Sequence, residues 1–160
     1  MPALIPFKLN GRELEARLTA LDKSQAVIEF NMDGTILSAN ENFLQTMGYT
    51  LSEIKGQHHS MFVDSAYRHS SEYQEFWTIL NQGRYHSAEY QRFGKHGKEI
   101  WIQASYNPIL DINGRTLKVV KFATDITEQK IRAADAAGKK DVAAKDDRRV
   151  VVAPDKDDMA

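Results

Sequence analysis

Residues 33–43 read DGTILSANENF, a run in which a turn, a short strand and the start of a helix follow one another. Asp33-Gly34 is a typical hairpin turn, because glycine readily adopts the positive φ that tight turns need. The flanking stretches Ala26–Phe30 and Ile36–Ser38 contain the apolar and β-branched residues that favour strands. The sequence therefore predicts a β-hairpin at this point of the chain.

Two short helices are predicted directly after the hairpin. Asn40 is a suitable N-cap for the first helix, and Gly48 is a suitable end. The apolar residues that this helix would place on one face are Phe43, Leu44 and Met47. Thr50 and Glu53 have the spacing of a capping box, and Gly56 would stop the second helix after a single turn.

Helical periodicity recurs on both sides of this region. Residues 11–24 carry a leucine stripe at helical spacing, formed by Leu14, Leu18 and Leu21. Ser70–Asn81 shows the same kind of spacing, and Gly83 would end that helix. Its apolar positions are Tyr73, Phe76, Trp77 and Leu80. Residues 57–69 show no period, so we expect irregular backbone there, with a single helical turn near Ser65.

Three strands are predicted after the last helix. They cover His86–Phe93, Glu99–Leu110 and Leu117–Thr124, and glycine-containing turns separate them. The middle strand alternates between two sets of residues, Ile100, Ile102 and Ala104 against Trp101, Gln103 and Ser105. Such alternation indicates that the two faces of the strand have different surroundings.

The order of these elements predicts an α+β fold. We expect a five-stranded antiparallel sheet with short helices on one face and the amphipathic helix at the N-terminal end. Residues 24–130 would form this domain, and residues 1–23 would form an N-terminal segment that contains the amphipathic helix. Residues 131–160 have no aromatic residue and many charges, so we expect a frayed or disordered tail.

The composition excludes several kinds of function. The chain has 21 basic and 22 acidic residues and a net charge of -1, so it offers no broad positive field for nucleic acid. It has no cysteine, which excludes thiolate metal sites and cysteine nucleophiles. No stretch approaches the roughly 18 apolar residues of a membrane span, so we expect a cytoplasmic protein without direct membrane insertion. No catalytic spacing is recognisable, and we do not expect an enzyme.

Four stretches, in this order, resemble the PAS family. The run at 33–43 is similar to that family's first hairpin and helix start, and GYTLSEIKG at 48–56 is similar to its next segment. The turn KHGK at 95–98 with Trp101, and the stretch DITE at 125–128, complete a resemblance that covers residues 24–130. It implies a PAS fold that holds a ligand between its sheet and its helices and signals to another protein.

A narrower resemblance concerns the PAS modules of bacterial chemoreceptors, including aerotaxis receptors. It rests on KGQHHSMFV at residues 55–63 and on WIQASYNP at residues 101–108. It implies a sensory module of a chemotaxis or redox-sensing pathway, with a chemoreceptor or kinase as the downstream signalling partner. The sequence lacks the long methyl-accepting coiled coil of such receptors, so we expect a fragment or a free-standing relative.

The resemblance implies a flavin, FAD, as the first candidate ligand. In flavin-binding members a tryptophan of the helix at 70–81 packs near the flavin ring, and the residue here is Trp77. The other residues that we expect around the flavin are Asn42, His59, Tyr85 and Asn107. Trp77 could equally fill the core, Asn42 could be a solvated helix residue, and Asn107 could shape a turn. The absence of cysteine rules out flavin–cysteine photochemistry.

Two alternatives to flavin remain open. PAS domains can hold haem b through one axial histidine, and the candidate ligands are His58, His59 and His69. The second alternative is a module without a cofactor that only mediates dimerisation. In either case we expect a homodimer through the leucine stripe of residues 11–24, unless the stripe covers the outer face of the sheet.

Overall fold

The computed structural model describes residues 10–138, and the structural statements below concern this part of the chain. Of the tail predicted at residues 131–160 as frayed or disordered, residues 131–136 belong to a helix and residues 139–160 lie outside the described part, as do residues 1–9 of the N-terminal segment. The elements are α1 (Gly11–Ser24), β1 (Ala26–Asn31), β2 (Ile36–Ala39), α2 (Glu41–Met47), α3 (Leu51–Ile54), η1 (His59–Phe62), α4 (Ser65–Arg68), α5 (Ser71–Asn81), β3 (His86–Phe93), η2 (Lys95–Gly97), β4 (Glu99–Leu110), β5 (Thr116–Asp125) and α6 (Thr127–Ala136).

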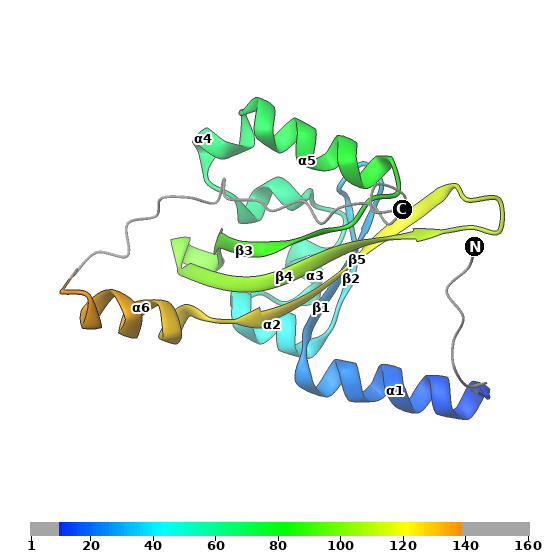
Figure 1. Cartoon of the computed structure of the whole chain (residues 1–160), viewed down its shortest axis with the longest axis horizontal. Coiled ribbons are helices and arrows are strands. Elements are labelled where there is room, and N and C mark those ends of the chain that lie inside the picture. The colour runs from blue at the N-terminus through cyan, green and yellow to red at the C-terminus, as the bar shows by residue number, and fades with distance from the viewer. Residues whose placement is uncertain (1–9, 139–160) are drawn as a thin grey trace, which may run out of the picture.

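The five strands form one antiparallel sheet in the order β2-β1-β5-β4-β3. Strand β5 therefore lies in the centre and joins the first hairpin to the pair formed by β3 and β4. Figure 1 shows α4 and α5 on one side of the sheet, and α1 and α6 extending away from it. The predicted α+β architecture with its N-terminal amphipathic helix is confirmed.

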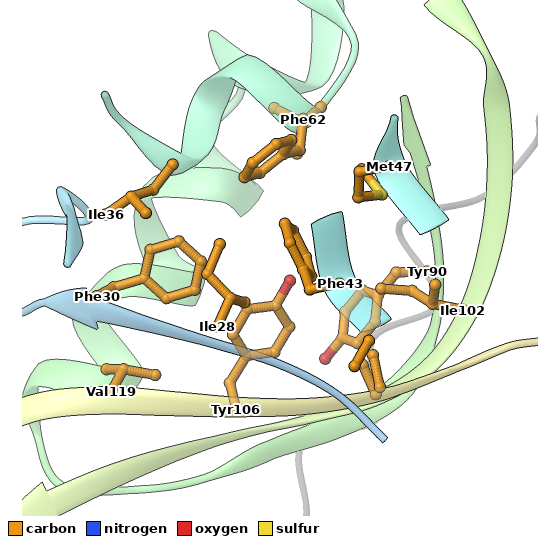
Figure 2. Packing of buried hydrophobic residues seen from close by; sticks show 14 of the residues in the cluster. Ile28, Phe30, Ile36, Phe43, Met47, Phe62, Tyr90, Ile102, Tyr106 and Val119 are labelled. Atoms are coloured by element: carbon orange, nitrogen blue, oxygen red, sulfur yellow. The ribbon is translucent and has the colours of Figure 1, made fainter. Parts of the chain in front are cut away.

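The core lies between the helices and the inner face of the sheet. The helices and η1 bury Phe43, Met47, Ile54, Phe62, Tyr73, Phe76 and Leu80. The sheet adds Ile28, Phe30, Tyr90, Ile102, Tyr106 and Val119 to the same cluster. Figure 2 shows side chains of both sets meeting, with the ring of Tyr106 rising from the sheet beside Ile28 and Phe43. Removing this apolar surface from water is the main force that holds the two layers together.

Side chains near the first hairpin fix the helix that follows it. The Oδ1 atom of Asn40 accepts hydrogen bonds from the backbone N–H groups of Phe43 at 3.0 Å and Val27 at 2.9 Å. Gly48 ends α2 with a φ of 80°, a value that glycine adopts without strain. The predicted N-cap and helix end are confirmed, and Asn40 also ties α2 to β1.

The stretch 57–69 is more ordered than the sequence predicts. His58 begins η1, because its Nδ1 accepts from the backbone N–H of Ser60 at 3.0 Å. Asp64 begins α4, because its carboxylate accepts from the backbone N–H of Tyr67 at 2.7 Å. The turn expected near Ser65 is thus confirmed, whereas η1 was not predicted. Each element has only 4 residues, too few to show a helical period.

Strand β4 has two differently covered faces, as its alternation predicts. Ile100, Ile102 and Ala104 face the core. On the outer face Trp101 is only 7% exposed. Helix α6 provides this cover, because the Nζ of Lys130 lies 5.0 Å from the centre of the indole ring. The first turn of the C-terminal helix is therefore held against the outer face of the sheet, and the rest of the helix extends away from it (Figure 1).

Helix α1 does not cover the sheet. None of its residues is buried, and its leucine stripe stays between 39% and 61% exposed at Leu14, Leu18 and Leu21. This is the amphipathic helix that the sequence predicts, but with its apolar side open to solvent. Among the helices of residues 10–138, none has both the length and the apolar character needed to cross a bilayer.

Candidate functional site

A buried hydrogen-bond network joins the helix layer to the sheet. Its central residue is His59 of η1, which is fully buried. The Nδ1 atom of His59 lies 2.7 Å from the hydroxyl of Tyr73 in α5, and its Nε2 lies 3.0 Å from the hydroxyl of Tyr106 in β4. One imidazole therefore contacts both layers of the domain.

The imidazole of His59 is neutral at physiological pH. Burial lowers its pKa well below the ordinary histidine value, and the positive charges of Arg92 and Lys121 lower the pKa further. A neutral imidazole has one N–H donor and one acceptor nitrogen. His59 consequently donates to one tyrosine hydroxyl and accepts from the other. His59 can therefore donate to Tyr73 and accept from Tyr106, or the reverse. A change at either tyrosine hydroxyl can select between these two arrangements.

Aromatic rings surround this network. Six ring centres lie between 5.2 and 6.2 Å from that of His59, those of Phe30, Phe62, Tyr73, Phe76, Trp77 and Tyr106. Trp77 also packs edge to face against Phe30, at 5.9 Å between ring centres. The region between η1, α5 and the sheet is thus lined by aromatic rings, with the polar atoms of the network at its centre.

Two cationic side chains lie on the inner face of the sheet. Arg92 of β3 is 0% exposed and Lys121 of β5 is 1% exposed. Arg92 donates from Nη2 to the hydroxyl of Tyr106 at 3.3 Å, and its guanidinium lies 4.7 Å from the ring centre of Tyr90. The Nζ of Lys121 lies 4.8 Å from the ring centre of Tyr106. Both positive charges therefore meet at one phenol of the network.

A second inward-facing histidine lies on the edge strand β3. His86 is 2% exposed and packs against Phe76 of α5, with 5.0 Å between ring centres. Neither of its ring nitrogens has a hydrogen-bond partner in the described part of the chain. Burial, and then the positive charge of Arg84, lower the pKa of His86 to about 4. This ring is neutral and offers one donor and one acceptor to an occupant of the interior.

Of the five residues predicted to contact a flavin, the structure brings together two. Trp77 and His59 lie 5.4 Å apart between ring centres. Tyr85 lies just before β3 and is 43% exposed. Asn42 donates from Nδ2 to the carbonyls of Asp22 and Lys23, both at 2.9 Å, at the end of α1.

Asn107 also lies away from the interior. It shares the outer face of β4 with Trp101, since both have odd positions in the strand. Its Nδ2 donates to Ser105 Oγ at 3.1 Å and to the carbonyl of Val120 at 3.1 Å. In this conformation Asn42, Tyr85 and Asn107 therefore do not lie together, and both amides make hydrogen bonds within the fold. Their contact with a flavin stays a prediction.

The three histidines predicted as haem ligands do not offer a free buried nitrogen. Both nitrogens of His59 are held by tyrosine hydroxyls. His58 is exposed, and its Nε2 lies 2.8 Å from the carbonyl of Asp33. His69 is also exposed, with Nδ1 at 2.8 Å from the carbonyl of Ser65. Axial coordination of haem does not fit these three residues as they are arranged.

Sequence reasoning missed the inward-facing set formed by His86, Arg92 and Lys121. Strand alternation contains the signal: Lys121 lies between Val119 and Ala123 on β5, and both of these face the core. Arg92 has the same relation to the buried Tyr90 on β3. A charged residue is usually assigned to solvent, and this general preference hid the periodicity.

Comparison with known proteins gives a consistent result. Residues 36–123 match the family described as the PAS fold. The biofilm dispersion protein BdlA of Pseudomonas aeruginosa is 42% identical over 117 residues, which cover 73% of this chain and 28% of BdlA. The aerotaxis receptor of Escherichia coli is 28% identical over 105 residues, which cover 66% of this chain and 20% of the receptor. The chain thus spans less than a third of the length of either relative.

Solved structures have the same fold. The PAS domain of a protein from Colwellia psychrerythraea matches with a TM-score of 0.63 at 22% identity, over 72% of this chain and 98% of that one. An RNA-binding light-oxygen-voltage receptor matches with a TM-score of 0.66 at 20% identity, over 86% of this chain and 39% of that one. At such identities the likeness concerns the fold alone.

Proposed function

Since this chain belongs to the PAS fold family, we propose that it is the cytoplasmic sensory module of a bacterial chemotaxis or redox-sensing pathway. It would bind a ligand in its interior, without catalysing a reaction, and pass the signal to a downstream chemoreceptor or kinase. The observation that carries this proposal is the His59 network, because it contacts η1, α5 and β4 at the point where a ligand would sit. A ligand that favours one direction of the network would shift the population of conformations.

Strand β4 supplies a route from the network to the C-terminal helix. Tyr106 belongs to this strand, and so does Trp101, whose carbonyl accepts from the backbone N–H of Ile126 at 2.8 Å. The backbone N–H of Trp101 also donates to the hydroxyl of Thr127, the first residue of α6, at 2.9 Å. A shift of β4 would therefore change the position from which α6 starts.

Asn40 and Asn42 supply the corresponding link to the N-terminal helix. The side-chain amide of Asn42 holds the last carbonyls of α1, and the amide of Asn40 donates to the carbonyl of Gln25 at 2.9 Å. Both asparagines belong to the start of α2, a helix that buries Phe43 in the core. We propose that a change in the core alters the position of α1 through this contact.

Removing the Asn42 amide should loosen α1 without unfolding the domain. An Asn42→Ala variant loses hydrogen bonds worth about 1 kcal/mol, so amides in the last turn of α1 should exchange about fivefold faster. Hydrogen exchange followed by mass spectrometry measures this, with Gln45→Ala on the exposed side of α2 as the matched control. Unchanged exchange in α1 of Asn42→Ala would refute the proposed link.

Flavin is the first proposed occupant, and its support rests on Trp77 and His59 alone. When bound, it would supply reversible redox chemistry. The indole of Trp77 would offer a planar contact surface, and its buried Nε1 makes no hydrogen bond of normal geometry within the described residues. The amides expected at the flavin edge lie elsewhere, so we assign no residue to that role.

The flavin proposal predicts visible flavin absorption in protein purified without added cofactor. Trp77→Ala should lower the flavin content about three- to tenfold, because it removes the aromatic contact surface. Tyr85→Ala is the matched control and should keep the content of the unchanged protein, because Tyr85 is 43% exposed and outside the interior. A featureless spectrum, or a Trp77→Ala variant with full flavin content, would exclude this role.

A module without cofactor that only dimerises is the second candidate function. It is favoured by α1, whose leucine stripe of Leu14, Leu18 and Leu21 is exposed in the described chain. We propose that this stripe packs against the same stripe of a second copy. Such an apolar contact would form a homodimer and would also place the two sensory domains side by side.

A further inference from the structure

We propose that His58 is a proton sensor, because its imidazole can hold the start of η1 only while the ring is neutral. This inference deepens the proposed sensory function and rests on it, since it names a stimulus, the proton, and the residue that receives it. His58 is exposed, so protons of the solvent reach its ring. The next residue, His59, is the centre of the buried network, and the sensor therefore lies directly beside the candidate site.

Two hydrogen bonds define the protonation state of His58. Its Nδ1 accepts from the backbone N–H of Ser60 at 3.0 Å, so Nδ1 carries no proton. Its Nε2 lies 2.8 Å from the carbonyl oxygen of Asp33, which can only accept, so Nε2 carries the proton. The ring is therefore a neutral imidazole in the Nε2–H form. Each of the other two forms of the ring would lose at least one of these hydrogen bonds.

A second proton on His58 removes the hydrogen bond that begins η1. The charged imidazole has donors at both nitrogens, so its Nδ1–H would face the backbone N–H of Ser60. Two donors do not form a hydrogen bond, and the ring would have to turn away. The carboxylate of Asp33 offers the charged ring an alternative partner. The pKa of Asp33 is lowered first by hydrogen bonds from Thr35 and then by the charge of His58, so these two charges interact.

The ring of His58 lies against the first hairpin and near α5, so a change in its orientation affects both. A Cβ atom at Gly34 would lie 2.5 Å from the Nε2 of His58, which shows how closely the ring rests on the turn. From α5, the ring centre of Trp77 lies 6.2 Å away. Within residues 10–138, the titratable groups that face His58 are Asp33 of the turn and His59 of η1, since α5 contributes the uncharged Trp77.

The backbone of η1 connects His58 to the buried network. The backbone N–H of His59 donates to the carbonyl of Gly34 at 2.8 Å, which joins η1 to the hairpin where the His58 ring lies. The imidazole of His59 in turn contacts the two tyrosine hydroxyls of the network. Loss of the hydrogen bond to Ser60 would loosen the segment that holds this imidazole in place.

His69 offers a direct comparison within the chain. It is exposed like His58, and its ring also contacts the backbone, with Nδ1 at 2.8 Å from the carbonyl of Ser65. A nitrogen that faces a carbonyl oxygen is a donor, and it stays a donor when the ring gains a second proton. The contact of His69 therefore survives protonation, whereas the contact of His58 with Ser60 does not. We expect a proton response at the accepting histidine alone.

NMR spectroscopy of the full 160-residue chain tests the proposal between about pH 7.5 and about pH 5, where histidine side chains change charge. The side-chain nitrogen shifts of His58 should show the Nε2–H form at the upper limit and a charged ring at the lower one. Amide exchange at His59 and Ser60, relative to the rates of an unstructured chain, should become about fivefold faster or more at the lower limit. An Nδ1–H form at the upper limit, a ring that stays neutral, or a charged ring with unchanged exchange at both amides would each overturn the proposal.

A matched pair of histidine variants locates the response. Asparagine is a good N-cap that does not titrate, so His58→Asn should keep η1 and reduce the change at Ser60 to less than about twofold. His69→Asn should keep the change of the unmodified chain. Any global loss of stability at low pH is common to all three chains, and their comparison therefore isolates His58. A full response in His58→Asn, or equal losses in both variants, would contradict the proposal. If His58→Asn fails to fold by circular dichroism, the measurements on the unmodified chain decide.

The failure of this sensor can be told apart from the failure of the sensory function. The proton response is measured at His59 and Ser60, whereas signalling is followed by hydrogen exchange in α1 and α6 over the same pH range, with His58→Asn as the reference. A response at Ser60 that leaves both helices unchanged would support the role of His58 and count against the sensory function. Absence of a response at Ser60 would remove that role and leave the flavin experiment as the test of sensing.

Discussion

Replacing His59 with alanine should lower the free energy of unfolding by about 4 kcal/mol, which is a large part of the 5 to 15 kcal/mol of a typical domain. The substitution leaves a cavity among six aromatic rings. It also removes the imidazole that both buried hydroxyls of Tyr73 and Tyr106 contact, although Tyr106 keeps its hydrogen bond from Arg92. Chemical denaturation followed by tryptophan fluorescence and circular dichroism would measure the loss.

A substitution to phenylalanine separates packing from hydrogen bonding at this position. His59→Phe fills most of the cavity but still leaves both tyrosine hydroxyls without the imidazole, so a loss of about 2 kcal/mol is expected. His58→Ala is the neighbouring control: it removes the cap of η1 and the contact with Asp33 but leaves no buried cavity, so its loss should be about 1 kcal/mol, well below that of His59→Ala. If His59→Ala cost no more than His58→Ala, the central role of the network would be wrong.

Most of the fold could be predicted because its signals are local. The caps at Asn40 and Thr50, the glycine stops and the turn at Asp33-Gly34 each act within a few residues, and the structure places elements where they predict. The glycine-containing turns located β3 and β4 with their observed bounds, and alternation predicted the two faces of β4. Element η1 was missed because it begins at a side-chain cap, that of His58, and shows no apolar periodicity.

The candidate site was harder to predict because it depends on the direction of polar side chains. Asn42 lies on α2, a helix that faces the core, yet its amide turns to the end of α1. No local pattern contains that information, because the carbonyl groups it meets are 19 and 20 residues away. Asn107 is different, since alternation with Trp101 already places it on the outer face.

Charged residues at inward-facing strand positions form the part of the site at which alternation and the usual exposure of charges predict opposite placements. Lys121 alternates correctly with Val119 and Ala123, but a lysine in a strand is far more often solvated. It becomes buried because the central position of β5 places it near Phe43 of α2 and beside Tyr106 of the neighbouring strand β4. The topology of the sheet decides this burial, and composition does not.

Acidification should destabilise the domain at pH values where carboxylates are still ionised. The pKa of His86 falls from an ordinary 6.5 to about 4 in the folded state, and that of His59 is also well below 6.5. The unfolded chain therefore binds protons that the folded chain does not, and stability falls as the pH drops through this range. The charged group that acts on His86 is Arg84, whose positive charge lowers its pKa.

Between about pH 7 and about pH 5 we expect a loss of roughly 3 kcal/mol, shared between the two histidines. Urea unfolding at a series of pH values measures it. His86→Leu should remove about half of the slope while keeping the interior apolar. Glu53, whose pKa of about 2 is set by Lys95, is exposed and titrates below this window, so Glu53→Gln is the control that leaves the slope unchanged. An unfolding free energy that stays constant down to about pH 5 would mean that both imidazoles are protonated or hydrated in the folded domain, and the neutral network would then lose its physical basis.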